Sequence, residues 1–214
     1  MQYEMHTLGV TRTARFYTLG HAGAHIRRIW WCFHGYGQLA ADFLTPFFCL
    51  DDGQTLFIAP EGLSRFYLKS GVGQVGASWM TKEMREAEIA DYLNYFRKIE
   101  QEVYASWEHP FEMHLLGFSQ GCATVCRWLL HSRFTPSKLI LWGGVFPHDW
   151  DFEKAAERLQ GAPVYFVLGK EDRFITPEQL LSFIDMHKKY GFDMKPLFYE
   201  GGHEVKESVL ATLA

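Results

Sequence analysis

The sequence is 214 residues long, enough for one domain of the larger kind, and no linker, repeat or low-complexity segment divides it. Its composition, 48% hydrophobic and 21% charged, is that of a globular protein and argues against disorder. The net charge of -4, without a basic block, speaks against a nucleic-acid partner. The start of the chain lacks the pattern of a signal peptide, and the apolar runs are far shorter than the roughly 20 residues of a membrane span, so we expect a cytoplasmic protein without stable membrane insertion.

The first part of the chain is rich in predicted strands. Residues 6–11 and 14–19 predict a β-hairpin. Residues 29–33 and 55–59 are continuous apolar runs, which is typical of strands buried on both faces of a sheet. The connection that follows, residues 61–81, is long, and we expect it to be a functional loop.

Helices and strands alternate in the rest of the chain. Strands are expected, in chain order, at 112–117, 138–142, 164–168 and 195–199. Helices are expected at 82–106, at 120–132, from Thr176 to near Gly191, and at 204–213. Thr176 and Pro177 form the start of a capping pattern, and a glycine such as Gly191 is a common left-handed terminator.

This alternation implies a single α/β domain over residues 1–214. We expect a mostly parallel central sheet of about eight strands, with helices on both faces. In sheets of this kind, functional sites lie at the carboxyl ends of the strands. The strand-to-helix loops are therefore the places to look for chemistry.

The segment Gly117-Phe118-Ser119-Gln120-Gly121 matches the pattern G-x-S-x-G between a predicted strand and a predicted helix. A serine on such a tight turn lies in a strained backbone conformation, and its neighbours two residues before and after must be small. The N-terminus of the following helix directs N–H groups toward an oxyanion formed at the serine. This context predicts that Ser119 is a nucleophile rather than a helix-capping residue.

A serine nucleophile needs a histidine base within hydrogen-bond reach. Among ten histidines, His203 alone follows the last predicted strand directly, in Gly201-Gly202-His203. Its loop belongs to the same carboxyl edge as Ser119. His21 and His25 have no third ligand near them, and the four cysteines lack metal-type spacing, so we expect no metal and interpret the cysteines as buried free thiols.

The base in turn needs an acid that orients it and stabilises the imidazolium. Asp172 follows the predicted strand 164–168 and gives the chain order Ser119, Asp172, His203, which α/β-hydrolases show. Glu171 is the nearest alternative. Asp149 and Asp151, after the preceding strand, are more distant alternatives.

The loop His34-Gly35-Tyr36-Gly37 follows the predicted strand 29–33. A loop in this place can offer a backbone N–H to the tetrahedral intermediate. We expect the backbone N–H groups of Tyr36 and Gln120 to form the oxyanion hole. His34 is expected to support the loop by hydrogen bonds rather than to take part in catalysis.

Together these segments resemble the phospholipase/carboxylesterase family of small serine hydrolases, which includes acyl-protein thioesterases. The matching pieces are His34 to Gly37, Gly117 to Gly121, Gly169 to Asp172 and Gly202-His203, with Ala59-Pro60 and Ser78-Trp79 beside them. The resemblance implies an α/β-hydrolase fold. It also implies a compact, largely lid-less enzyme that cleaves carboxylic esters or thioesters through an acyl-enzyme on Ser119, without a cofactor.

The chain departs from this family at three places. Gln38 stands where acyl-protein thioesterases typically have an acidic residue, Cys122 replaces a small residue, and the segment after Asp172 is one residue longer. These departures leave the natural substrate open. The same triad could serve a peptidase or a lactone hydrolase; a catalytically silent binding protein of the same fold is disfavoured because every triad member is present.

A substrate pocket is predicted from aromatic residues near the carboxyl edge. Trp79 and Phe66, in the connection 61–81, and Phe146 and Phe174, on neighbouring loops, could line a pocket for the acyl group of a small ester or thioester. Trp79 is the preferred pocket residue. The alternative is that some of these side chains cover the core.

Overall fold

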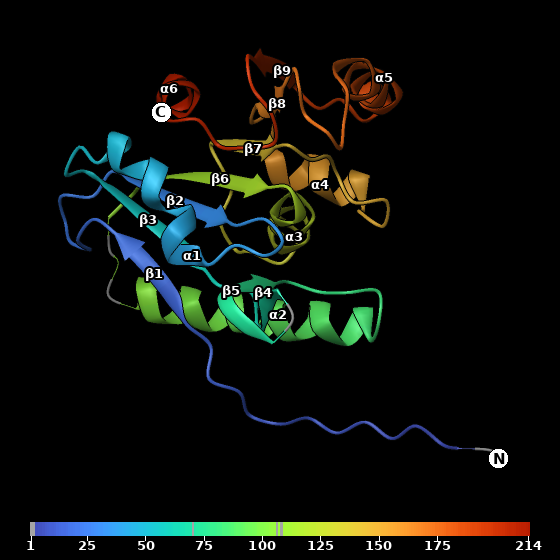
Figure 1. The fold of residues 1–214 in the computed structure, drawn as a ribbon. Coiled ribbons are helices and arrows are strands. Elements are labelled where there is room, and N and C mark those ends of the chain that lie inside the picture. Colours follow the sequence, from blue (N-terminus) through green and yellow to red (C-terminus); the bar gives the residue numbers. More distant parts are fainter. Residues whose placement is uncertain (1–2, 70, 106, 108) are drawn as a thin grey trace.

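The computed structural model describes residues 3–69, 71–105, 107 and 109–214. Seven strands form the central sheet (Figure 1): β1 (Phe16–Leu19), β2 (Arg28–Phe33), β3 (Thr55–Pro60), β6 (Glu112–Phe118), β7 (Lys138–Trp142), β8 (Val164–Gly169) and β9 (Met194–Tyr199). Their order is β1-β3-β2-β6-β7-β8-β9, and only β1 runs antiparallel to its neighbour. The expected mostly parallel sheet is confirmed, with seven strands rather than about eight.

The helices cover both faces of this sheet, as expected. They are α1 (Ala40–Phe43), α2 (Arg85–Tyr104), α3 (Gln120–Leu129), α4 (Phe152–Leu159), α5 (Pro177–His187) and α6 (Glu207–Leu210), with 3-10 turns at Thr45–Leu50, Lys188–Tyr190 and Ala211–Leu213. Helices α2 to α5 pack on one face, and α1 and α6 pack on the other. Side chains of β2 therefore alternate between the two faces. Trp31 and Phe33 pack in the core under α2 to α5, while Trp30 and Cys32 pack in the core under α1 and α6.

Helix ends agree well with local signals. The Thr176 side chain accepts a hydrogen bond from the Gln179 N–H, which completes the capping box before α5, and Gly191 has a φ of 75° where this helical segment ends. Helix α4 was not predicted, although Asp151 caps it by accepting from the Lys154 N–H. Ser106, at the end of the predicted helix 82–106, lies outside the described residues.

The predicted hairpin over residues 6–11 and 14–19 is wrong. Residues 3–15 have no regular secondary structure, and β1 pairs with β3 instead. Leu8 and Val10 are 83% and 79% exposed, so the segment before β1 buries neither of these apolar side chains. Because an isolated two-stranded hairpin is marginal in water, the early segment gains little from pairing locally.

The connection 61–81 is not a simple loop. It contains a second, antiparallel sheet formed by β4 (Ser64–Lys69) and β5 (Val72–Ser78), while Ser70 lies outside the described residues. The backbone of this hairpin also pairs with the first part of the chain, because Gln38 forms a bridge with Ala77. The long connection is therefore anchored beside the loop that follows β2.

Two further observations bear on the expectations from composition. Within the described part of the chain, no helix combines the length and the apolar character that crossing a bilayer requires.

The four cysteines are free thiols, of which Cys32, Cys122 and Cys126 are buried as expected. Cys49 is instead exposed, because it lies on the outer 3-10 turn after α1.

His114, in β6, makes the fold sensitive to acid. Its ring is buried, and Nδ1 has no hydrogen-bond partner among the described residues. Burial, together with the charges of Lys138 and Arg28, lowers the pKa of His114 to about 3 from an ordinary value of 6.5. The folded protein therefore keeps this ring neutral over a range in which the unfolded chain binds a proton.

We expect the free energy of unfolding to fall as the pH decreases from about 6.5 toward 3, by on the order of 1 kcal/mol per pH unit from this residue. His114→Phe removes the group and should reduce this slope. His148→Phe, a change at an exposed histidine, is the control and should keep the wild-type slope. Urea unfolding at several pH values measures both; equal slopes in wild type and His114→Phe would contradict the assignment.

Candidate active site

Ser119 occupies a strained turn between β6 and α3. Its backbone has φ 53° and ψ −116°, a conformation that costs free energy for any residue with a side chain. Two hydrogen bonds hold the turn: the Ser119 N–H donates to the Trp142 carbonyl at 2.8 Å, and the Ser119 carbonyl accepts from the Cys122 N–H at 3.0 Å. The strain is thus maintained by the neighbouring strand β7 and by the start of α3.

The two glycines of the motif are required by close backbone approach. A Cβ atom on Gly117 would overlap the carbonyl oxygen of Gly121. A Cβ atom on Gly121 would overlap the carbonyl oxygen of Phe33, at the end of β2. The clearance predicted from the pattern is therefore present, and it brings α3 against the strand that carries the His34 loop.

His203 and Asp172 form a hydrogen-bonded pair. Nδ1 of His203 lies 2.6 Å from Oδ2 of Asp172, whose side chain is only 1% exposed. The other carboxylate oxygen, Oδ1, accepts from the backbone N–H groups of Phe174 at 2.8 Å and Ile175 at 3.3 Å. With a carboxylate as its partner, Nδ1 carries the proton and donates it, which leaves Nε2 as the basic nitrogen.

The alternative acids lie elsewhere. Glu171 is exposed, and only its backbone N–H contacts this region, by donating to the Gly201 carbonyl. Asp149 is held by Arg127 and Arg85, whose hydrogen bonds keep the pKa of Asp149 well below its ordinary value although burial alone would raise it. The geometry therefore favours Asp172 as the partner of the histidine.

Ser119 and His203 lie against the same loop, after β7. A Cβ atom on Gly143 would lie 2.8 Å from Cε1 of His203, and one on Gly144 would lie 3.0 Å from the Ser119 carbonyl oxygen. The ring of Phe118 is 4.8 Å from the His203 ring. Among the described residues no hydrogen bond joins the Ser119 hydroxyl to His203; such bonds are often long in unliganded enzymes and shorten in the substrate complex.

The loop after β2 is held rigidly by His34. The buried ring donates from Nδ1 to the Gly35 carbonyl at 2.8 Å and accepts at Nε2 from the Gly62 N–H at 2.9 Å. Burial lowers the pKa of His34 to about 4, so the ring is neutral at pH 7. These contacts agree with the supporting role expected for His34.

Trp79 supports the same loop through a hydrogen bond and a ring contact with His34. Its indole Nε1–H donates to the His34 carbonyl at 2.8 Å, and its ring stacks on the His34 ring at 4.6 Å. The side chain amide of Gln120 ties this segment to α3, because it donates to the Met80 carbonyl at 2.8 Å. The loop, the end of the β4–β5 hairpin and the start of α3 therefore form one connected unit.

Backbone amides of the loop differ in their partners. The N–H groups of Gly35, Gly37 and Gln38 donate to Gln38 Oε1, the Ala77 carbonyl and the Gly35 carbonyl, at 2.8, 2.8 and 3.2 Å respectively. For the N–H groups of Tyr36 and Gln120, the described residues supply no acceptor. These are the two amides expected from the sequence to bind an oxyanion.

The structure divides the four predicted pocket residues into two pairs. Phe66 packs on Tyr36 with ring centroids 5.1 Å apart, and the ring of Phe174, which is 60% exposed, lies 4.6 Å from that of His203. Both therefore border the site.

Trp79 and Phe146 are 1% and 3% exposed and belong to the core. Phe146 packs on Trp150 and Phe166, at centroid distances of 4.6 and 5.1 Å. Their burial argues against the predicted pocket role: the core already encloses both rings.

Sequence reasoning did not identify the hollow beside His203. It has a volume of about 260 Å³ and is lined by Gln38, Asp42, Phe43, Pro46, Phe118, His203, Glu204 and Val205. Part of this wall comes from α1 and the turn after it, elements too short to give a periodic pattern.

Glu61, directly after β3, was also missed. Its buried carboxylate accepts hydrogen bonds from Arg15 at 2.6 Å, Arg65 at 3.3 Å and the backbone N–H of Ala40 at 3.3 Å. Burial alone would raise the pKa of Glu61, but these donors lower it below its ordinary value. An acidic residue at the end of a buried strand was the available signal, and its position joins β1, β4 and α1 near the site.

Comparison with known proteins gives one family and many similar folds. The model of a family described as serine hydrolase (FSH1) matches residues 54–209, a range that includes Ser119, Asp172 and His203. No curated protein sequence matches the chain.

Similar solved structures include esterase PE8, acyl-protein thioesterase 2 of Zea mays and a phospholipase/carboxylesterase of Dyadobacter fermentans DSM 18053. Their identities to this chain are 18%, 18% and 15%, and their TM-scores are 0.65, 0.65 and 0.66. The matches cover 94%, 94% and 96% of this chain, and 95%, 96% and 97% of the respective neighbours. At these identities the likeness shows the fold, and it confirms the expected α/β architecture.

Proposed function

The chain belongs to the serine hydrolase (FSH1) family, and from that premise we propose that it cleaves carboxylic ester or thioester bonds through an acyl-enzyme on Ser119. The observation that carries this proposal is the hydrogen bond of 2.6 Å between His203 and the buried Asp172, at the same sheet edge as the strained Ser119. A surface histidine would have no need of a buried, fully hydrogen-bonded carboxylate. A base held in one tautomer needs such a partner.

In the proposed mechanism, the Ser119 hydroxyl attacks the acyl carbonyl and gives its proton to Nε2 of His203. The backbone N–H groups of Tyr36 and Gln120 hold the oxyanion. His203 then protonates the leaving group. Water, deprotonated by the same nitrogen, attacks the acyl-enzyme and releases the acid, while Asp172 stabilises the imidazolium in both steps.

The names of similar proteins favour esters and thioesters over amides and lactones, and two features of the site suit an acyl substrate. The similar structures carry the names esterase, acyl-protein thioesterase and phospholipase/carboxylesterase. Phe174 beside His203 and Phe66 beside Tyr36 offer apolar surface, which suits an acyl group. The hollow of about 260 Å³ lined in part by His203 provides room for a leaving group of modest size. We expect a panel of esters, thioesters, lactones and aminoacyl amides to show turnover of the first two classes.

Labelling with a fluorophosphonate tests the proposal directly. The reagent reacts with an activated serine, so the folded wild-type chain should label at neutral pH and Ser119→Ala should not. Ser137→Ala, a change at an exposed serine near the start of β7, is the matched control and should label like the wild type. A folded wild type that does not label, or a Ser119→Ala variant that labels equally, would disprove the role of Ser119.

A further inference from the structure

A second pocket lies at the opposite edge of the sheet from Ser119. It has a volume of about 370 Å³ and is lined by Tyr104, Trp107, Phe111, Arg133 and Phe134. These residues come from the end of α2, the segment before β6 and the segment after α3. Because β6 starts at Glu112 and leads to Ser119 at its far end, the pocket is separated from the candidate active site by the length of that strand.

The aromatic walls are already in place. The ring of Tyr104 stacks on that of Phe111 at 5.4 Å with an angle of 2°, and it contacts the ring of Phe134 at 4.6 Å. Its hydroxyl accepts a hydrogen bond of 2.9 Å from the indole of the buried Trp31. Trp107, Phe111 and Phe134 are only half-buried, so aromatic surface faces the pocket. A flat ring entering it would meet preformed edges and faces.

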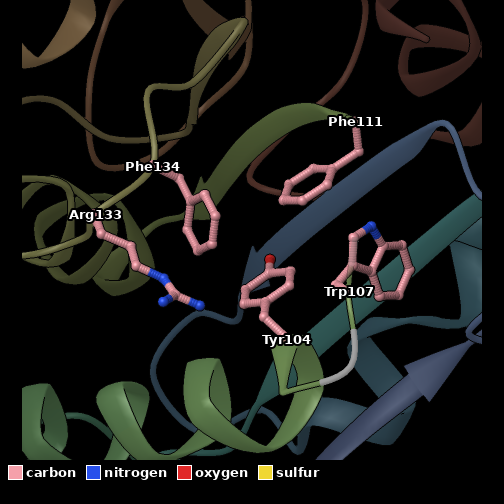
Figure 2. A pocket seen from close by; sticks show the side chains of 5 residues that line it. All are labelled: Tyr104, Trp107, Phe111, Arg133 and Phe134. Atoms are coloured by element: carbon pink, nitrogen blue, oxygen red, sulfur yellow. The ribbon is translucent and has the colours of Figure 1, made fainter. Parts of the chain in front are cut away.

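Arg133 supplies the charge of this pocket. Its guanidinium carbon lies 4.8 Å from the ring centre of Phe134 and 6.0 Å from that of Tyr104. Figure 2 shows Arg133 and Trp107 on opposite sides, with Tyr104 between them. A guanidinium that lies over an aromatic ring still has N–H groups at its edges. These can bind a carboxylate with two hydrogen bonds.

The charges around the pocket favour an anion. Among the salt bridges of the described residues, none involves Arg133. A ligand cation would compete with Arg133 for the same ring faces and would be repelled by it. Acids also lie near the pocket in the sequence. Glu100, one helical turn before Tyr104, is buried, and burial raises its pKa, which reduces its negative charge. The carboxylate of Glu112, directly after Phe111, is exposed and lies 3.4 Å from Nε2 of His114.

Trp107 provides an unsatisfied donor at the far wall. Its Nε1–H is buried and has no hydrogen-bond partner among the described residues. Buried donors of this kind are rare in folded proteins because each leaves a hydrogen bond unmade. The indole ring lines the pocket while its N–H is enclosed behind the wall, so a ligand on the ring changes the surroundings of this N–H.

We propose that this pocket binds a small aromatic carboxylate, with its ring on the surface that the half-buried Trp107, Phe111 and Phe134 expose and its carboxylate on Arg133. The volume suits a compound of one or two rings. The site is independent of the hydrolase chemistry, since it shares no residue with the candidate active site.

Titration of the full chain with 2-naphthoate tests the site. In a ¹H–¹⁵N spectrum the indole N–H of Trp107 is identified as the resonance that Trp107→Phe removes, and it should shift saturably as the probe binds. Arg133→Gln should weaken binding about tenfold or more, because a charge-assisted hydrogen-bonded pair is lost. Arg133→Lys, which keeps the charge but not the fork, should weaken it by roughly threefold.

Two controls make the outcome decisive. Arg173 also stacks on a phenylalanine, Phe174, at 4.8 Å but lies outside the pocket, so Arg173→Gln should bind 2-naphthoate like the wild type. The neutral probe 2-naphthamide should bind about tenfold more weakly than the carboxylate. Each of three results overturns the proposal: no saturable shift of the Trp107 resonance up to the solubility of the probe, equal binding by folded Arg133→Gln, or equal binding of the amide.

Discussion

Asp172→Asn is expected to lower the turnover of an ester substrate about 10⁴-fold at neutral pH while the protein remains folded. The reason lies in the two sides of the carboxylate. Oδ1 accepts from the N–H groups of Phe174 and Ile175, so an asparagine would place its carbonyl oxygen there. Its NH₂ group would then face Nδ1 of His203. That nitrogen would have to accept, the proton would move to Nε2, and Nε2 could no longer act as a base.

The matched control is Glu171→Gln, the same chemical change one residue earlier on an exposed side chain. It should retain turnover within about twofold of the wild type, as surface substitutions usually do. Initial rates with a chromogenic ester, together with the rate of fluorophosphonate labelling, measure both variants. If Glu171→Gln lost activity and Asp172→Asn kept it, the acid of the triad would be Glu171.

Trp79→Phe is expected to separate support of the loop His34 to Gly37, the proposed source of the Tyr36 oxyanion N–H, from general stability. The change keeps an aromatic ring against His34 but removes the N–H that the His34 carbonyl accepts at 2.8 Å. Leaving that buried carbonyl without its donor should cost about 1–3 kcal/mol of unfolding free energy. Because the loop carries the Tyr36 N–H, small displacements should also lower the rate constant for turnover, by about tenfold.

Trp150→Phe provides the comparison. The Trp150 indole is equally buried and donates to the Cys126 carbonyl at 2.8 Å, in the core beneath α3 and α4. It should lose a similar amount of stability in urea unfolding but keep its turnover. A Trp79→Phe variant that loses stability without any loss of turnover would show that the tryptophan does not position the loop.

Local sequence signals predicted the parts of the fold whose patterns repeat over many residues. The six predicted runs became β2, β3, β6, β7, β8 and β9. The first five lie inside the sheet, where strands covered on both faces must be largely apolar, while β9 is an edge strand in which only Tyr199 is buried. The capping pattern at Thr176 began α5, since its side chain and that of Gln179 satisfy backbone groups locally. Helix α1 has four residues, too few to show a period. Helix α4 was not expected although Phe152, Ala155 and Leu159 recur at helical spacing, because its eight residues give only two turns of pattern.

Pairing between distant segments was beyond local signals. Phe16–Leu19 pairs with Thr55–Pro60, so a hairpin predicted from neighbouring residues did not form. The β4–β5 hairpin is local, but the sequence predicts a loop there, because exposed residues on both strands weaken the alternation that marks a half-buried strand.

For the candidate site, the sequence by itself determined that a serine on a strand-to-helix turn is followed by an acid and a histidine, each after a later strand of a parallel sheet. Chain order and spacing suffice for that, because parallel strands end at one edge. Only the tertiary structure paired His203 with Asp172 instead of Glu171, since neighbouring residues in a chain point in different directions. Only the tertiary structure, too, put Trp79 and Phe146 in the core and Phe66 and Phe174 beside the site: an aromatic residue has the same sequence signature in both places, and packing decides which surface it covers.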